Sequence, residues 1–235
     1  MTNTEDIYII SAVRTAIGDF GGALKQFRPA DLGALVIREA IKRAGLQPAD
    51  VEHVVMGQVM PTGPKDQFMA RVAALKADIP VESPALTLNR LCGSGVQSII
   101  SSAQMMKLGE AAITVAGGAE SMTNVAYHVP GGRWGKKLGN SILLDAVVEG
   151  LTDPIHGIHM AITAENVAER YQVTREAQDE LAVEGHQRAA RAIAEGRFSE
   201  QILPVEIKTR KGSVFFYEDE HVRPDVDKAS VKSMK

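Results

Sequence analysis

Short segments rich in Val and Ile alternate with amphipathic segments through the first 121 residues. Residues 7–13 (IYIISAV) and 51–56 (VEHVVM) have the composition of buried strands. Between them, residues 31–44 place apolar side chains at helical spacing, and Gly45 follows as a C-cap. Strands that alternate with helices form parallel sheets covered by helices, so we predict an α/β fold with a mostly parallel or mixed sheet.

The alternation continues with a helix over residues 68–77, which ends before Pro80. A strand over 85–91 then leads directly into Cys-Gly-Ser-Gly and a helix over 96–108. A further strand, over 112–117, ends in a pair of glycines. These elements complete a predicted amino-terminal α/β domain over residues 1–121.

From Met122 the pattern changes. Residues 122–160 are rich in Gly and Pro and show no sustained periodicity, which predicts an irregular, loop-rich excursion. Two helices should follow, over 163–171 and 174–195. Thr174 should cap the second, and one face of that helix should carry Ala177, Leu181, Ala189 and Ile193. A strand pair is expected within 202–222. We predict that residues 122–235 form an inserted, loop-rich α+β domain.

Composition excludes several classes of protein. The formal net charge is −3, which gives no electrostatic case for a nucleic acid or an anionic membrane as partner. No apolar run has the roughly 20 residues that a membrane helix needs, and the acidic start is unlike a signal peptide. The single cysteine, Cys92, excludes an intramolecular disulfide. We therefore expect a reducing compartment, the cytoplasm.

Cys92 is the residue where chemistry is expected. It lies where a predicted strand ends and a predicted helix begins, at the positive end of the helix dipole. Free backbone N–H groups there would stabilise a thiolate and, later, the oxyanion of a thioester intermediate. Gly93 and Gly95 would permit a sharp turn and close approach of a substrate. The motif alone is also compatible with a buried, inert cysteine.

Five segments together resemble the thiolase family. They are VRTAIGDFGG (13–22), NRLCGSG (89–95), GGAESMT (117–123), GIHMAITAENVAERY (157–171) and TRKGSV (209–214). The Leu91 and Gly93 variant of the cysteine motif looks like the acetoacetyl-CoA or short-chain 3-ketoacyl-CoA thiolases. The resemblance implies a layered thiolase-type fold and acyl-CoA C-acyltransferase activity, by condensation or by thiolytic cleavage of 3-ketoacyl-CoA.

The resemblance also implies roles for individual residues. Cys92 would become acylated, with its backbone N–H in an oxyanion hole. Leu151, His159 and Met160 would lie along coenzyme A, and Arg223 near its adenine nucleotide. From the residues alone, core packing is favoured for Met160 and a solvated surface charge for Arg223, and only the resemblance favours the ligand roles. Coenzyme A and acetyl-CoA would be substrates, and no covalently bound cofactor is implied.

Other features carry weaker hypotheses. His156 and His159 are spaced like a metal pair, but the sequence supplies no third ligand, so no metal site is expected. The basic residues Lys208, Arg210 and Lys211 could meet the phosphates of coenzyme A or be merely solvated. Residues 127–145 correspond to a segment that contributes to tetramer assembly in related enzymes. We expect a homo-oligomer, either a dimer or a tetramer.

The family pattern also contains a carboxy-terminal half that has no counterpart here. Its Gly-His-Pro histidine, Cys-Gly-Gly cysteine and Asn-Glu-Ala-Phe segment do not occur in the sequence. We therefore expect a truncated fold with exposed apolar faces and negligible turnover by this chain alone. Alternatives are a catalytically silent acyl-CoA-binding or scaffold subunit, a ketosynthase, and a structural α/β protein with a buried cysteine.

Overall fold

The computed structural model describes residues 6–232, and the chain divides into two compact units. The first unit combines the residues up to 126 with 203–217, and the second combines 127–202 with the residues from 218 onward. The segment 203–217 thus belongs to the first unit although it follows the excursion in sequence. The predicted domain boundary at residue 121 stays a prediction.

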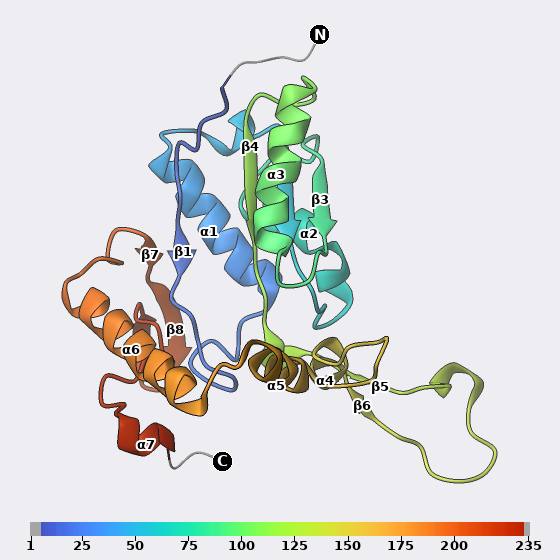
Figure 1. Ribbon diagram of the computed structural model, residues 1–235. Helices are drawn as coiled ribbons and strands as arrows, with labels where there is room; N and C mark the ends of the chain where they lie inside the picture. Colours follow the sequence, from blue (N-terminus) through green and yellow to red (C-terminus); the bar gives the residue numbers. More distant parts are fainter. Residues whose placement is uncertain (1–5, 233–235) are drawn as a thin grey trace. The chain divides into compact units, whose positions relative to one another are not determined.

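The first unit contains a three-stranded parallel sheet in the order β3-β2-β4 (Figure 1). The central strand β2 (His53–Gly57) pairs with β3 (Ala85–Leu88) and with β4 (Thr114–Gly118). The predicted parallel sheet is therefore confirmed. The strand β3 is shorter than expected because the chain turns at residue 89.

Helices cover both faces of this sheet. The helices α1 (Pro29–Arg43) and α2 (Met69–Lys76) pack together on the face that bears Met56, whose Cε would lie 3.5 Å from a Cβ added at Gly33 of α1. The next residue along β2, Gly57, faces α3 (Ser94–Lys107) instead. Alternate residues of a strand point to opposite faces, which explains this division. Short 3₁₀ turns precede β2 (Pro48–Asp50) and α2 (Pro64–Phe68).

The hydrophobic core of the first unit lies between α1, α2 and the sheet. Each of its fully buried aliphatic side chains stabilises the fold by about 1.5–3 kcal/mol relative to exposure. Its members include Ile37, Ile41, Val51, Val54, Met56, Met69, Ala73 and Ile79. The glycine that follows α1, Gly45, has φ of +71°, the left-handed conformation expected at the end of a helix.

The helix α3 turns its small polar side chains toward the sheet. Ser94, Ser98 and Ser102 are buried, while Val96 and Ile99 are exposed. Serines let the helix approach the sheet closely, and the apolar side chains of α3 on its other side are left exposed by residues 6–232. This exposure agrees with the expectation that the chain by itself presents apolar faces to solvent.

The predicted first strand, residues 7–13, is wrong as a paired strand. Among the described residues the segment joins no ladder, and strand structure begins only after it, at β1 (Arg14–Thr15). Tyr8, Ile9 and Ile10 are 74%, 75% and 62% exposed. Val and Ile composition favours a strand only where a neighbouring strand accepts its hydrogen bonds, and among the described residues β4 pairs with β2 alone. An apolar cavity of about 390 Å³ lies along this segment and β4.

The remaining elements of the first unit are short. A 3₁₀ turn (Met122–Asn124) follows β4. The strands β8 (Val205–Thr209) and β9 (Gly212–Phe216) form an antiparallel hairpin, which confirms the predicted strand pair. A two-residue strand β7 (Ile202–Leu203) spans the boundary between the units.

The second unit is mostly helical and irregular. It contains the two-stranded pair β5 (Tyr127–His128) and β6 (Leu144–Asp145), a 3₁₀ turn (Gly132–Trp134), and the helices α4 (Ala146–Gly150), α5 (Met160–Tyr171), α6 (Arg175–Ala194) and α7 (Lys228–Lys232). The helices α4 and α7 and the pair of β5 with β6 were not predicted. No helix in residues 6–232 is both long enough and apolar enough to cross a bilayer.

The predicted N-cap of α6 is confirmed, whereas the predicted apolar face is wrong at Leu181. The hydroxyl of Thr174 accepts a hydrogen bond from the N–H of Ala177 at 3.2 Å, as expected of an N-cap. Leu181, expected on the apolar face, is 67% exposed, and Val183 is buried in its place. Val183 packs with Val226 and Val231, which come from a segment whose position the spacing along α6 could not reveal.

Gly57 should be intolerant of a side chain. A Cβ there would lie 2.7 Å from both the backbone carbonyl carbon and the Cβ of Ser94, a contact that requires α3 to shift. We expect Gly57→Ala to lower the free energy of unfolding by about 1–3 kcal/mol, measured by urea denaturation. Gly95→Ala is the matched control, because a Cβ at Gly95 meets nothing within 4 Å. Equal stability of the two variants would contradict the packing described here.

Candidate functional site

The candidate site is the turn that joins β3 to α3. The N–H of Gly93 donates to the carbonyl of Arg90 at 3.2 Å, and the N–H of Ser94 donates to the carbonyl of Leu91 at 3.0 Å. Leu91 has φ of +51°, a left-handed conformation that costs a non-glycine residue on the order of 1 kcal/mol. Such strain persists only where surrounding contacts hold the chain in place.

Side chains on both sides of the turn supply these contacts. Asn89 accepts a hydrogen bond from the N–H of Leu91 at its Oδ1, at 2.9 Å. The hydroxyl of Ser94 accepts from the N–H of Arg90 at 2.8 Å and donates to the carbonyl of Leu91 at 2.6 Å. The left-handed residue is thus held at both its N–H and its carbonyl group.

Cys92 lies at the tip of this turn. It immediately precedes Gly93, the N-cap of α3, and its side chain is exposed. The predicted position at the start of a helix is therefore confirmed, and Cys92 is not buried within the described part of the chain. The backbone of Cys92 thus lies at the positive end of a helix of 14 residues, where negative charge is stabilised.

The glycines of the motif do not make the sharp turn that the sequence predicted, and their role in close approach of a substrate stays a prediction. Gly93 has φ of −85°, and Gly95 is not among the residues with positive φ. The sharp turn is made by Leu91 instead. A Cβ at Gly95 would point into open space, so nothing within the described chain requires a glycine there. A ligand that approaches the backbone closely would supply such a requirement.

Two residues that sequence reasoning did not select support the turn. Gly57, at the end of β2, admits the backbone of Ser94 against the sheet. Glu120, two residues beyond β4, accepts hydrogen bonds from the N–H groups of Val59 at 2.7 Å and Met60 at 3.2 Å. Glu120 lies within GGAESMT, but neither its spacing nor its composition indicated a contact 60 residues earlier in the chain.

The carboxyl group of Glu120 has a raised pKa. Although the side chain retains contact with solvent, neighbouring atoms desolvate its carboxylate, and this is the largest cause of the raised pKa. The two backbone N–H groups act in the opposite direction, and the charge of Asp66 adds to the increase in pKa. Asp66 is fully buried.

Three of the predicted coenzyme A contacts lie together in the second unit. The N–H of Met160 donates to the carbonyl of Leu151 at 2.8 Å, and Thr152 forms an antiparallel bridge with His159. His159 is the N-cap of α5, and its Nδ1 accepts from the N–H of Ala161 at 3.1 Å. This bond leaves Nε2 as the protonated nitrogen of a neutral ring. Met160 is 41% exposed, so core packing does not explain it.

Arg223 lies elsewhere in the second unit. Its backbone N–H donates to Nδ1 of His186 on α6 at 3.2 Å, and the ring of His186 lies 5.9 Å from that of His221. Within residues 6–232 the guanidinium of Arg223 has no ion-pair partner. A ligand role and a solvated charge both remain compatible with this position.

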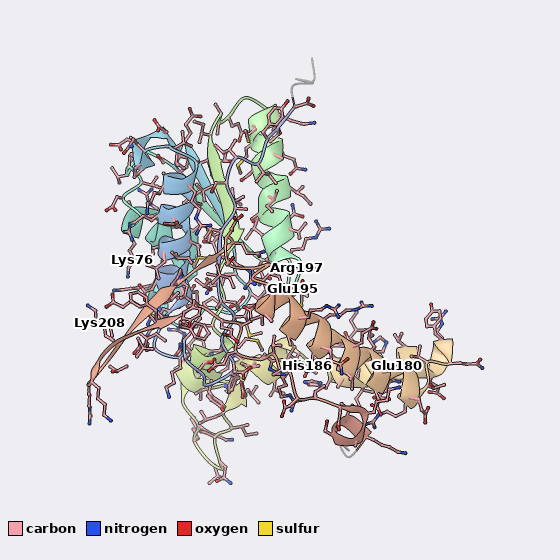
Figure 2. All side chains as sticks on the ribbon, turned by 90° about the vertical axis from the view of Figure 1, so that its left-hand side faces the viewer. Lys76, Glu180, His186, Glu195, Arg197 and Lys208 are labelled. Atoms are coloured by element: carbon pink, nitrogen blue, oxygen red, sulfur yellow. The ribbon has the colours of Figure 1, made fainter. Side chains whose placement is uncertain are left out.

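The other basic and histidine residues have separate surroundings. Nδ1 of His156 lies 2.5 Å from Oδ2 of Asp153, and this hydrogen bond is the largest cause of the lowered pKa of Asp153. No group of three metal-ligating side chains occurs in the described part of the chain. Lys208 on β8 lines a surface pocket with Lys76 of α2 (Figure 2). Whether Lys208, Arg210 or Lys211 meets phosphates stays a prediction.

Comparison with known proteins gives consistent results. The model of the thiolase N-terminal domain matches residues 7–235. The chain is 51% identical over 222 residues to the Beta-ketothiolase BktB of Cupriavidus necator, covering 94% of this chain and 56% of that protein. It is 45% identical to an acetyl-CoA acetyltransferase of the same organism, covering 98% of this chain and 59% of the relative.

Solved structures agree in fold. The crystal structure of the Bacillus anthracis acetyl-CoA acetyltransferase superposes with a TM-score of 0.93 at 42% identity, covering 97% of this chain and 57% of that one. Human mitochondrial 3-ketoacyl-CoA thiolase in complex with CoA gives a TM-score of 0.92 at 36% identity, covering 96% and 56%. The chain thus spans somewhat more than half the length of these relatives.

A strand-to-helix turn that presents an exposed cysteine, the family match over residues 7–235 and the shared fold lead to one conclusion. The chain belongs to the thiolase family, of which it contains the N-terminal domain region.

Proposed function

We propose that the protein is an acyl-CoA C-acyltransferase in which Cys92 carries the acyl group. The observation that supports this most directly is the exposed sulfur at the N-terminus of α3. Relatives named acetyl-CoA acetyltransferase and β-ketothiolase cover almost the whole chain. The proposed substrates are coenzyme A thioesters, acetyl-CoA among them, and the reaction requires no covalently bound cofactor.

The first chemical step begins when the Cys92 thiol gives its proton to a base, and the resemblance assigns activation of this nucleophile to the Gly-His-Pro histidine of the carboxy-terminal half, which is not in the sequence. The Cys92 sulfur attacks the thioester carbonyl, a carbon–sulfur bond forms, and coenzyme A leaves as a thiolate that takes up a proton. Negative charge develops on the carbonyl oxygen in the transition state, where backbone N–H groups at the helix start stabilise it. One thioester replaces another, so the step is close to energetically neutral and runs in both directions.

The condensation step requires more than this chain contains. A second acetyl-CoA must lose a proton before its carbanion can attack the acyl-cysteine, and a positioned base must accept that proton. The resemblance assigns this role to groups of the carboxy-terminal half, which are not in the sequence. In the complete protein we propose a homo-oligomer, a dimer or a tetramer, that acts in the cytoplasm on fatty-acid-derived thioesters.

A second candidate function follows from the partial coverage. Because the chain spans 56–59% of its curated relatives, it could bind acyl-CoA without completing the reaction, as a silent or scaffold subunit would. Binding of coenzyme A without acylation of Cys92 would favour this function over the proposed transferase.

Acylation of Cys92 is the first test. After incubation with acetyl-CoA, intact-mass analysis should show the gain of one acetyl group, and peptide mapping should place it on Cys92. Cys92→Ala removes the only thiol and should abolish the adduct. Ser101→Ala, which alters a hydroxyl on α3, is the control and should acylate normally. An acetyl group on another residue of the Cys92→Ala protein would refute the assignment.

Turnover should be absent from the isolated chain. We expect no catalytic cleavage of acetoacetyl-CoA by the purified 235-residue protein, because the proton-transfer groups are missing. Thioester loss is followed by absorbance, and a single acylation event per chain is the most that should occur. Multiple turnovers that disappear in Cys92→Ala would show that this region alone is a complete enzyme.

Arg223 should contribute to recognition of the nucleotide part of coenzyme A. We expect Arg223→Ala to weaken coenzyme A binding about five- to tenfold in calorimetry, as for loss of a charge-assisted hydrogen bond, and to leave pantetheine binding unchanged. Arg188→Ala on α6 removes an exposed arginine that pairs with Glu184, and it serves as the charge-matched control. Equal affinity of both variants for coenzyme A would assign Arg223 to the solvated surface.

A further inference from the structure

The backbone of Val59 is held at both its N–H and its carbonyl, at the carboxyl edge of the sheet. Its N–H donates to Oε2 of Glu120 at 2.7 Å, and its carbonyl accepts from Nδ2 of Asn89 at 3.1 Å. Glu120 follows β4, Val59 follows β2 and Asn89 follows β3. The carboxyl ends of parallel strands meet at one edge of a sheet, which is why segments distant in sequence come together here.

Asn89 connects the backbone of Val59 to the turn that contains Cys92. Its Nδ2 faces the carbonyl of Val59 while its Oδ1 accepts from the N–H of Leu91 at 2.9 Å. Only one orientation of the amide satisfies both bonds, because one partner is an acceptor and the other a donor. The position of Val59 therefore determines the orientation in which Asn89 can hold Leu91.

Leu91 is the residue that most needs to be held. It adopts a left-handed conformation, immediately precedes Cys92 and is 62% exposed, so packing of its own side chain contributes little. We propose that Glu120 is a positioning residue for Cys92 and acts through Val59 and Asn89 to keep the sulfur aligned with the start of α3. The inference rests on the proposed role of Cys92 as nucleophile.

A carboxylate suits this position better than an amide would. Glu120 accepts from two successive N–H groups, those of Val59 and Met60, one at each oxygen. A glutamine would turn its NH₂ group toward one of these donors. Desolvation raises the pKa of Glu120, whereas the two N–H groups act in the opposite direction and favour the carboxylate that accepts from them.

The rate of alkylation of Cys92 by iodoacetamide tests the proposal without any coenzyme A. The sequence contains one cysteine, so a single rate constant is measured by mass spectrometry. Access does not limit this rate, since the side chain is exposed. We expect Glu120→Gln and Asn89→Asp each to slow alkylation about three- to tenfold, because the thiolate loses its fixed alignment with the helix N-terminus. Glu82→Gln, an equal charge change at an exposed site on the same unit, should have no effect.

The double variant separates positioning from general stability. If Glu120 acts through Asn89, the combined variant should react within about twofold of the slower single variant. Rates are compared where circular dichroism shows all proteins folded. Unchanged rates, faster rates or multiplicative effects in the double variant would each overturn the proposal. Should Glu120→Gln not fold, Asn89→Asp carries the test alone, and wild-type reactivity in that variant would overturn it.

Acylation by acetyl-CoA provides the second measurement. The same order of rates is expected as for alkylation. If acetyl-CoA acylates no variant, including the wild type, the proposed transferase function fails while the alkylation result still decides the role of Glu120. If acylation follows Glu120 and alkylation does not, Glu120 acts on the bound substrate and the positioning role is wrong.

Discussion

The contact between Gly57 and Ser94 is the constraint on which the candidate site depends. The first turn of α3 lies directly against the end of the central strand, at a distance that leaves no room for a Cβ. The stripe of serines along the inner side of α3 extends this close approach down the helix. As a result the start of α3, and the cysteine that precedes it, are anchored to the most deeply buried strand of the first unit. Such rigid support suits a nucleophile, because the backbone N–H groups beside it must already be in place when negative charge develops on the substrate oxygen.

Hydrogen bonds, rather than apolar packing, restrain the backbone of the turn. Leu91, Cys92 and Gly93 are all exposed, so few apolar contacts restrain them. The backbone of this segment is instead held by Asn89 and Ser94, and Asn89 is in turn oriented by the segment that Glu120 binds. Strain at Leu91 is thus maintained by polar groups from the ends of three strands. The second unit contributes a separate cluster, in which His159 caps α5 while Met160 and Leu151 share a backbone hydrogen bond.

Several elements were predictable because their signals are local. The strands β2 and β4, the helix α1 with Gly45 at its end, and the cap at Thr174 all follow from periodicity and capping chemistry within a few residues. The position of Cys92 at a helix start was predictable for the same reason. Residues 7–13 show the limit of such signals. Their apolar composition is that of a strand, but a strand also needs a partner, and β4 offers them no pairing among the described residues.

By itself, the sequence determined the alternation of strands and helices, the place of the only thiol and the family to which the chain belongs. The tertiary structure decided which residues support that thiol. Gly57 and Glu120 are separated from Cys92 by 35 and 28 positions, and their contacts depend on the order of strands in the sheet. The structure also decided that Leu91, rather than a glycine, makes the turn. Local patterns carry no information on such contacts, because a parallel sheet brings together the ends of strands that are distant along the chain.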